Sequence, residues 1–89
     1  MTISDTIHRR LVEALSPIHL EVIDESHLHA GHSGARPEGE THFRVVAVSS
    51  VFDGQSRIGR QRQVYALLND LLEGPVHALS LALSSPEDS

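Results

Sequence analysis

Apolar residues recur at helical spacing near the start of this 89-residue chain. Thr2 followed by Asp5 resembles a capping box, in which two residues satisfy each other's free main-chain N–H groups, with Ser4 as an alternative cap. Pro17 bars continuation because its ring removes an N–H donor and clashes with the preceding turn. The pattern predicts a helix over residues 3–15, with a buried stripe made of Ile3, Ile7, Leu11, Ala14 and Leu15.

Two later segments alternate polar and apolar residues, as half-buried strands do. The first is His19–Ile23 and the second is Thr41–Val48. The second half of Thr41–Val48 is apolar on both faces, which predicts a central, well-covered strand. Between the two strands, residues 25–40 hold four Gly or Pro positions and few apolar ones, which predicts a long loop. We expect the strands to pair antiparallel across this loop.

Helical spacing returns in the second half of the chain. Residues 52–55 predict a turn with Gly54 at positive φ. A short helix is expected around Ser56–Arg60, followed by a stronger one that Gly74-Pro75 ends. The stronger helix is indicated by the stripe Val64, Leu67, Leu68, Leu71 and Leu72.

The last predicted strand is Ala78–Leu83, where Leu alternates with small residues, and residues 84–89 are expected to form a flexible polar tail. Two helices then link the second and third strands, which allows a right-handed crossover and parallel pairing. The sequence therefore predicts one small α+β domain over residues 1–89 in the order α-β-β-α-α-β. Its three-stranded mixed sheet should have all helices packed on one face and the other face partly open.

Composition narrows the possible functions. The formal net charge is −5, and all seven cations are Arg, so general-purpose nucleic-acid binding is disfavoured. The chain has no Cys, which excludes disulfides and thiolate chemistry. Neither a signal peptide nor a membrane span is evident, so we expect a cytoplasmic protein without membrane contact. No nucleophile elbow, paired-carboxylate pattern or phosphate-binding Gly motif indicates an enzyme.

The histidines are the candidate metal-binding residues. His27, His29 and His32 fall within six positions of the loop, and His77 lies far along the chain. Imidazole is the commonest protein metal ligand, so these residues are candidate ligands. Two plainer interpretations stay open: His77 can be a half-buried structural residue, and the loop histidines can bind Zn²⁺ adventitiously, since a closed Zn²⁺ site usually needs four ligands.

Arg57, Arg60 and Arg62 crowd into six positions after Gly54 and can form a local basic patch. Such a patch can contact phosphate, dock an anionic partner, or simply be a solvated helix face. KH domains grip nucleic acid with a GXXG loop, but the segment Gly-Gln-Ser-Arg that begins at Gly54 keeps only the first Gly.

Four segments of the chain, taken in order, resemble the signature of the BolA family. They are Val-Ile-Asp-Glu-Ser-His at 22–27, Gly-Glu-Thr-His-Phe at 39–43, Phe-Asp-Gly at 52–54 leading into Arg-Gln-Arg-Gln-Val-Tyr at 60–65, and Gly-Pro-Val-His-Ala-Leu-Ser at 74–80. Together they cover nearly the whole chain. The resemblance implies a class II KH-like fold, which agrees with the element order predicted above.

The resemblance also implies a partner and a shared cofactor. BolA-like proteins share a bridging [2Fe–2S] cluster with a monothiol glutaredoxin of the CGFS type, whose Cys and glutathione supply the thiolates. His77 matches the family's cluster ligand in the Val-His-Ala-Leu segment, and a second ligand comes from the loop. His29 is the favoured match and His32 the alternative. The isolated protein, a monomer or weak homodimer, is then expected to hold no cofactor.

The implied function is therefore iron–sulfur trafficking or iron homeostasis. Some BolA-like proteins are described as transcriptional regulators, so the alternative is DNA binding through Gly54, Arg57, Arg60 and Arg62. Gln61 stands where the family often has a His between two Arg residues, which casts doubt on any role borrowed from that His.

Overall fold

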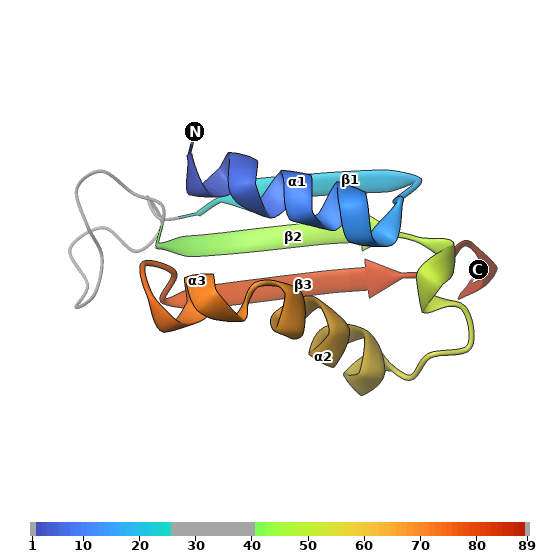
Figure 1. The fold of residues 1–89 in the computed structure, drawn as a ribbon. Helices are drawn as coiled ribbons and strands as arrows, with labels where there is room; N and C mark the ends of the chain where they lie inside the picture. The colour runs from blue at the N-terminus through green and yellow to red at the C-terminus, as the bar shows by residue number, and fades with distance from the viewer. Residues whose placement is uncertain (1, 26–40, 89) are drawn as a thin grey trace.

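The computed structural model describes residues 2–25 and 41–88 of the chain (Figure 1). The predicted order of helices and strands is confirmed. The elements are α1 (Ile3–Leu15), β1 (His19–Asp24), β2 (His42–Val48), a 3₁₀ turn η2 (Ser50–Phe52), α2 (Arg57–Leu67), α3 (Asn69–Glu73), β3 (Ala78–Ser84) and a second 3₁₀ turn η3 (Pro86–Asp88).

The three strands form one mixed sheet in the order β1-β2-β3. β1 pairs antiparallel with β2, from His19 opposite Val48 to Asp24 opposite Phe43. β2 pairs parallel with β3, beginning with His42 beside Ala78. All three helices lie on the same side of the sheet (Figure 1). The predicted α+β architecture is therefore confirmed, including the central place of the second strand and the parallel crossover.

The core lies between the helices and one face of the sheet. Alternate residues of β2 point to opposite faces, so Phe43 and Val45 are buried while Arg44 is exposed and Val46 is only partly covered. The second strand is central, as predicted, and the face of its second half that lies away from the helices is partly covered, at Val46 and Val48. β-branched residues favour strands whether or not another layer packs on them. An apolar run alone therefore does not show that a second layer covers the other face of the sheet. The buried core residues are Ile7, Leu11, Leu15, Phe43, Val45, Ala47, Phe52, Val64, Leu68 and Val76.

Helix α1 begins with the predicted capping box. The Thr2 hydroxyl accepts from the Asp5 N–H at 3.0 Å, and the Thr2 N–H donates to the Asp5 carboxylate at 3.1 Å. The Thr2 N–H and the Thr2 hydroxyl lower the pKa of that carboxyl. The helix ends at Ser16, which takes a left-handed conformation with φ of 42° immediately before Pro17.

The two later helices divide differently from the prediction. The first is the long one and runs to Leu67, and the second covers only five residues. They separate at Leu68, where the backbone leaves helical geometry at φ −117° and ψ 12°. The Arg10 guanidinium donates to the Leu67 carbonyl at 3.0 Å, and the Leu71 N–H bonds to Leu68 instead. A residue from α1 therefore takes up the carbonyl freed at the break, which no local pattern encodes.

The structure also corrects the predicted tail. Ser84 belongs to β3, and Ser85 is buried, with its hydroxyl donating to the Asp53 carboxylate. Arg60 forms an ion pair with Asp88 at 2.5 and 3.0 Å. Residues 84–88 are therefore bound to the end of the sheet and to α2, because their polar groups find partners that lie far away in the sequence.

Candidate functional site

His77 lies where β1 ends and where β2 and β3 begin. Its N–H donates to the Thr41 carbonyl at 2.7 Å, and the Ala78 N–H donates to the same oxygen at 3.2 Å. These bonds fix the backbone of His77 at the entry to β3, while its side chain is exposed to solvent. The structure thus presents His77 as an accessible imidazole on a rigid sheet end.

A second histidine accompanies it. The His42 ring stacks on the His77 ring, with centroids 6.1 Å apart and planes inclined by 12°. His42 Nδ1 also lies 2.8 Å from the Thr41 hydroxyl. His42 was not among the predicted site residues, although a signal existed: parallel pairing of the second and third predicted strands brings their first residues together.

The same sheet end is where the chain leaves and re-enters the described structure. The Glu25 N–H donates to the His42 carbonyl at 2.8 Å, and Thr41 directly precedes His42. The predicted ligands His29 and His32, and their neighbour His27, lie outside the described residues. Both residues that flank their segment therefore lie at this sheet end: Glu25 is bonded to His42, and Thr41 is bonded to His77.

Within residues 2–25 and 41–88, no three His, Asp or Glu side chains gather closely enough to hold a metal ion. His77 and His42 are the imidazoles that the described structure offers at this sheet end. A single exposed imidazole suits a metal centre to which other ligands are brought.

The three clustered arginines do not act as one patch. Arg57 and Arg62 are exposed, whereas the Arg60 side chain is only 12% exposed and is held by Asp88. Its Nε also donates to the Gln55 carbonyl at 3.1 Å. Hydrogen bonds from Arg60 lower the pKa of Asp88 to about 2, so the pair stays ionised at neutral pH. Arg60 is thus engaged in contacts within the domain, with Asp88 and Gln55.

The turn before α2 is as predicted. Gly54 has a φ of 74°, and the Gln55 N–H donates to the Phe52 carbonyl at 3.0 Å. Ser56 caps α2 by accepting from the Gly59 N–H at 3.0 Å.

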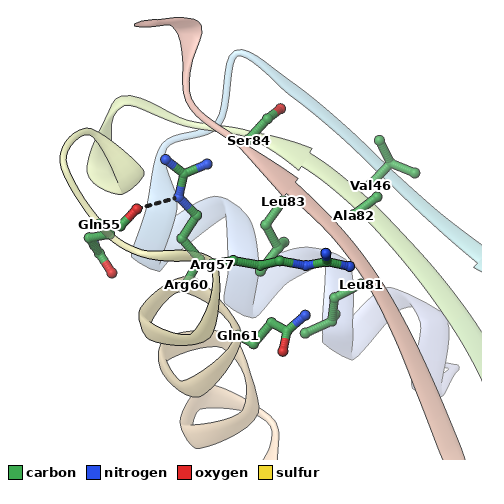
Figure 2. A pocket seen from close by; sticks show the side chains of 9 residues that line it. All are labelled: Val46, Gln55, Arg57, Arg60, Gln61, Leu81, Ala82, Leu83 and Ser84. Atoms are coloured by element: carbon green, nitrogen blue, oxygen red, sulfur yellow. Dashed lines mark hydrogen bonds between the residues drawn. The ribbon is translucent and has the colours of Figure 1, made fainter. Parts of the chain in front are cut away.

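A groove of about 540 Å³ lies between the first half of α2 and β3 (Figure 2). Arg57 and Arg60 contribute to its lining, but Arg62 does not. The groove lies along the outer edge of β3, so residues from both faces of the sheet line it. The lining residues are Val46, Gln55, Arg57, Arg60, Gln61, Leu81, Ala82, Leu83 and Ser84.

In the part of the chain that the structure describes, no helix is both long and apolar enough to cross a membrane.

Comparison with known proteins defines the class. BolA1 from Arabidopsis thaliana has a solved structure that superposes with a TM-score of 0.88 at 36% identity, over 100% of this chain and 97% of that one. The fold of this chain is thus that of a BolA-type domain. The family described as BolA-like protein matches residues 11–88, and the chain belongs to this family.

Two relatives differ in the share of their length that this chain covers. The chain is 45% identical to a Sinorhizobium protein named only as an uncharacterized protein in the cobS 5' region, over 97% of this chain and 94% of that one. It is 49% identical to BolA-like protein 1 of Homo sapiens, over 90% of this chain but only 56% of the human protein. The chain therefore spans about half the length of the human relative.

Proposed function

We propose that this protein shares a bridging [2Fe–2S] cluster with a monothiol glutaredoxin and glutathione, and acts in iron–sulfur trafficking or iron homeostasis. His77 supplies one ligand to the cluster. His29 supplies the second, with His32 as the alternative. The observation that carries the proposal is the exposed His77 imidazole, held beside His42 at the sheet end where both residues that flank the His-rich segment lie.

Two features of the described residues and one of the sequence support this role. The backbone of His77 is fixed by Thr41, so its ring is offered from a rigid base. The side chain is exposed, so ligands from another molecule can approach it. His29 follows Glu25 by four residues in the sequence, and four residues span at most about 14 Å, so this spacing is short enough for a loop ligand to act at the sheet end where Glu25 bonds to His42.

The donor set also fits a shared cluster. This chain has no thiolate, so it can offer only imidazole or carboxylate, while a glutaredoxin and glutathione offer sulfur. A cluster with imidazole on one iron and thiolate on the other has a raised reduction potential and ligands that protonate near neutral pH. The residues of this chain would position the imidazoles and leave the site open to a partner.

The first experiment is a visible absorption and circular-dichroism titration of a cluster-loaded monothiol glutaredoxin, with glutathione, by this protein. We expect a changed spectrum that saturates at one-to-one stoichiometry. His77→Ala should abolish that change, because it removes an exposed ligand without touching the core. Repeating the titration with His29→Ala and His32→Ala identifies the loop ligand.

His19→Ala is the matched control, since His19 is exposed at the opposite end of β1, beside Val48. It should leave the spectrum at its wild-type form. An unchanged spectrum with His77→Ala would overturn the ligand assignment. No spectral change with the wild-type protein and a competent glutaredoxin would overturn the proposed function.

DNA binding through the Gly54–Arg62 region stays an alternative prediction, now resting on Arg57 and Arg62. If DNA binds there, Arg57→Gln with Arg62→Gln should weaken binding and lower its salt dependence, because each phosphate that is no longer neutralised reduces that slope by about one. An unchanged slope would count against the alternative. Arg60 is unsuited to this test, because its substitution also frees Asp88.

A further inference from the structure

Strand β3 has one free edge in the described sheet, because it pairs with β2 alone. The Ser49 N–H donates to the Ser84 carbonyl at 3.0 Å, so the main chain of Ser84 is directed toward β2. In a parallel ladder, alternate residues direct both their main-chain groups to the same side. The N–H and C=O groups of Leu81 and Leu83 are therefore directed away from β2.

The beginning of this edge is already occupied. The Tyr65 hydroxyl of α2 donates to the Leu79 carbonyl at 3.2 Å, which covers the edge there and confirms the alternation. No hydrogen bond of this kind reaches Leu81 or Leu83 from the described part of the chain. The open edge is thus short, about one extended tripeptide long, and begins beyond Tyr65.

The groove between α2 and β3 follows this open edge. Its volume of about 540 Å³ lies within the range of small-ligand pockets. In Figure 2 the Arg57 side chain extends from the start of α2 toward β3, and both Arg57 and Leu81 line the groove. Val46 and Ala82 add apolar surface from the uncovered face of the sheet. An occupant therefore meets main-chain donors and acceptors, an apolar floor and the guanidinium groups of Arg57 and Arg60.

The guanidinium of Arg57 gives this groove its charge. Arg57 is exposed, and it forms no ion pair with residues 2–25 or 41–88. Arg60, the other cation in the lining, is neutralised by Asp88. In a chain of net charge −5, the groove therefore carries one local positive charge that no described carboxylate balances.

We propose that the open edge of β3 at Leu81–Leu83 accepts an extended segment of another protein as a fourth strand, and that an Asp or Glu side chain of this segment pairs with Arg57. A strand is the occupant that matches N–H and C=O groups repeating at every second residue. The carboxylate fixes its register against α2. The site begins about 13 Å and ends about 20 Å along β3 from His77, and it shares no residue with the proposed cluster site.

The test is an NMR titration of the ¹⁵N-labelled protein with the peptide acetyl-Ser-Val-Glu-Val-Glu-Ser-amide. We expect the largest shifts at the Leu81 and Leu83 amides. A version N-methylated at all four central residues should not bind, because it lacks N–H donors on whichever of its edges faces β3. Replacing both Glu by Gln should weaken binding about three- to fivefold, the size expected of an exposed ion pair.

Arg57→Gln should produce the same three- to fivefold loss with the Glu peptide and no further loss with the Gln peptide. Arg62→Gln is the matched control, because Arg62 is exposed on the same helix but does not line the groove. Its affinity should equal that of the wild type.

Three outcomes would overturn the proposal. Undiminished binding of the N-methylated peptide would show that no strand pairs with β3. Equal shifts produced by octanoate alone would define a small-carboxylate site instead. Displacement of the peptide by a short DNA duplex, with Arg62→Gln as damaging as Arg57→Gln, would assign the region to nucleic acid.

Discussion

At the scale of single residues, the positive φ of Gly54 sets the turn that leads into α2. Asp53 with φ −57° and ψ 128°, followed by Gly54 with φ 74°, forms a type II turn closed by the hydrogen bond from Gln55 to Phe52. An added Cβ at Gly54 would meet nothing within 4 Å. Any cost of substitution there is therefore conformational rather than steric against neighbours.

Gly54→Ala should lower the free energy of unfolding by about 1 kcal/mol, since L residues with a side chain resist positive φ. Gly54→Asn should lose less, because Asn tolerates this region. Urea denaturation followed by circular dichroism measures both. Equal stability of Gly54→Ala and the wild type would contradict the conformational argument.

The residues of the candidate site could be predicted from the sequence only in part. His77 was identified through the motif around it, not through any physical property of an isolated histidine. The sequence predicts His42 as a structural residue of the second strand, because its stacking on His77 depends on the parallel register. Arg60 looked like its neighbours in sequence, and only the fold brings Asp88 against it.

At the scale of elements, Arg10 joins α1 to the junction of α2 and α3. Its guanidinium bonds to the Leu67 carbonyl and to both carboxylate oxygens of Asp70, at 2.5 and 2.9 Å. Arg10 is thus the partner of both a main-chain acceptor and a side chain. The predicted helix boundaries failed here, because this contact spans residues 10 to 70 and leaves no periodic trace.

Arg10→Met should lower the melting temperature more than Asp70→Asn does. The first change leaves the Leu67 carbonyl without its donor, while the second keeps that bond and weakens only the exposed ion pair. Differential scanning calorimetry of the two variants decides the order. Equal melting temperatures would show that the carbonyl contact contributes nothing.

The period-two and helical patterns were sufficient for the order of elements and for the face of the sheet that packs on the helices. They were insufficient for residues 84–88, whose polar side chains resemble a solvated tail in sequence. Burial of Ser85 depends on Asp53, and anchoring of Asp88 depends on Arg60. Long-range polar pairs of this kind are invisible to local pattern.

At the scale of the whole molecule, two ion pairs link distant parts of the chain. Bonds from Arg10 lower the pKa of Asp70 to about 2, and bonds from Arg60 lower the pKa of Asp88 to about 2. A carboxyl whose pKa is depressed by folding stabilises the native state above its unfolded value, near 3.9. That contribution is lost as the pH falls through about 2.

Stability should therefore decline between about pH 4 and pH 2, and the double variant Asp70→Asn with Asp88→Asn should decline less steeply. Both carboxylates are partly exposed, at 65% and 39% of their side-chain area, so the difference should be modest. It should shrink in about 1 M NaCl, where screening acts within a few ångströms. Urea unfolding across this pH range measures it, and parallel pH profiles would refute it.

The parallel pairing of β2 and β3 has a consequence for the order in which the molecule folds. β3 can join β2 only after the chain closes over residues 49–77, and such non-local pairing is slow compared with forming local helices. The stack of His42 and His77 does not exist until that closure is complete. A newly made or partly unfolded chain therefore lacks the paired histidines, which exist only in molecules that have finished folding.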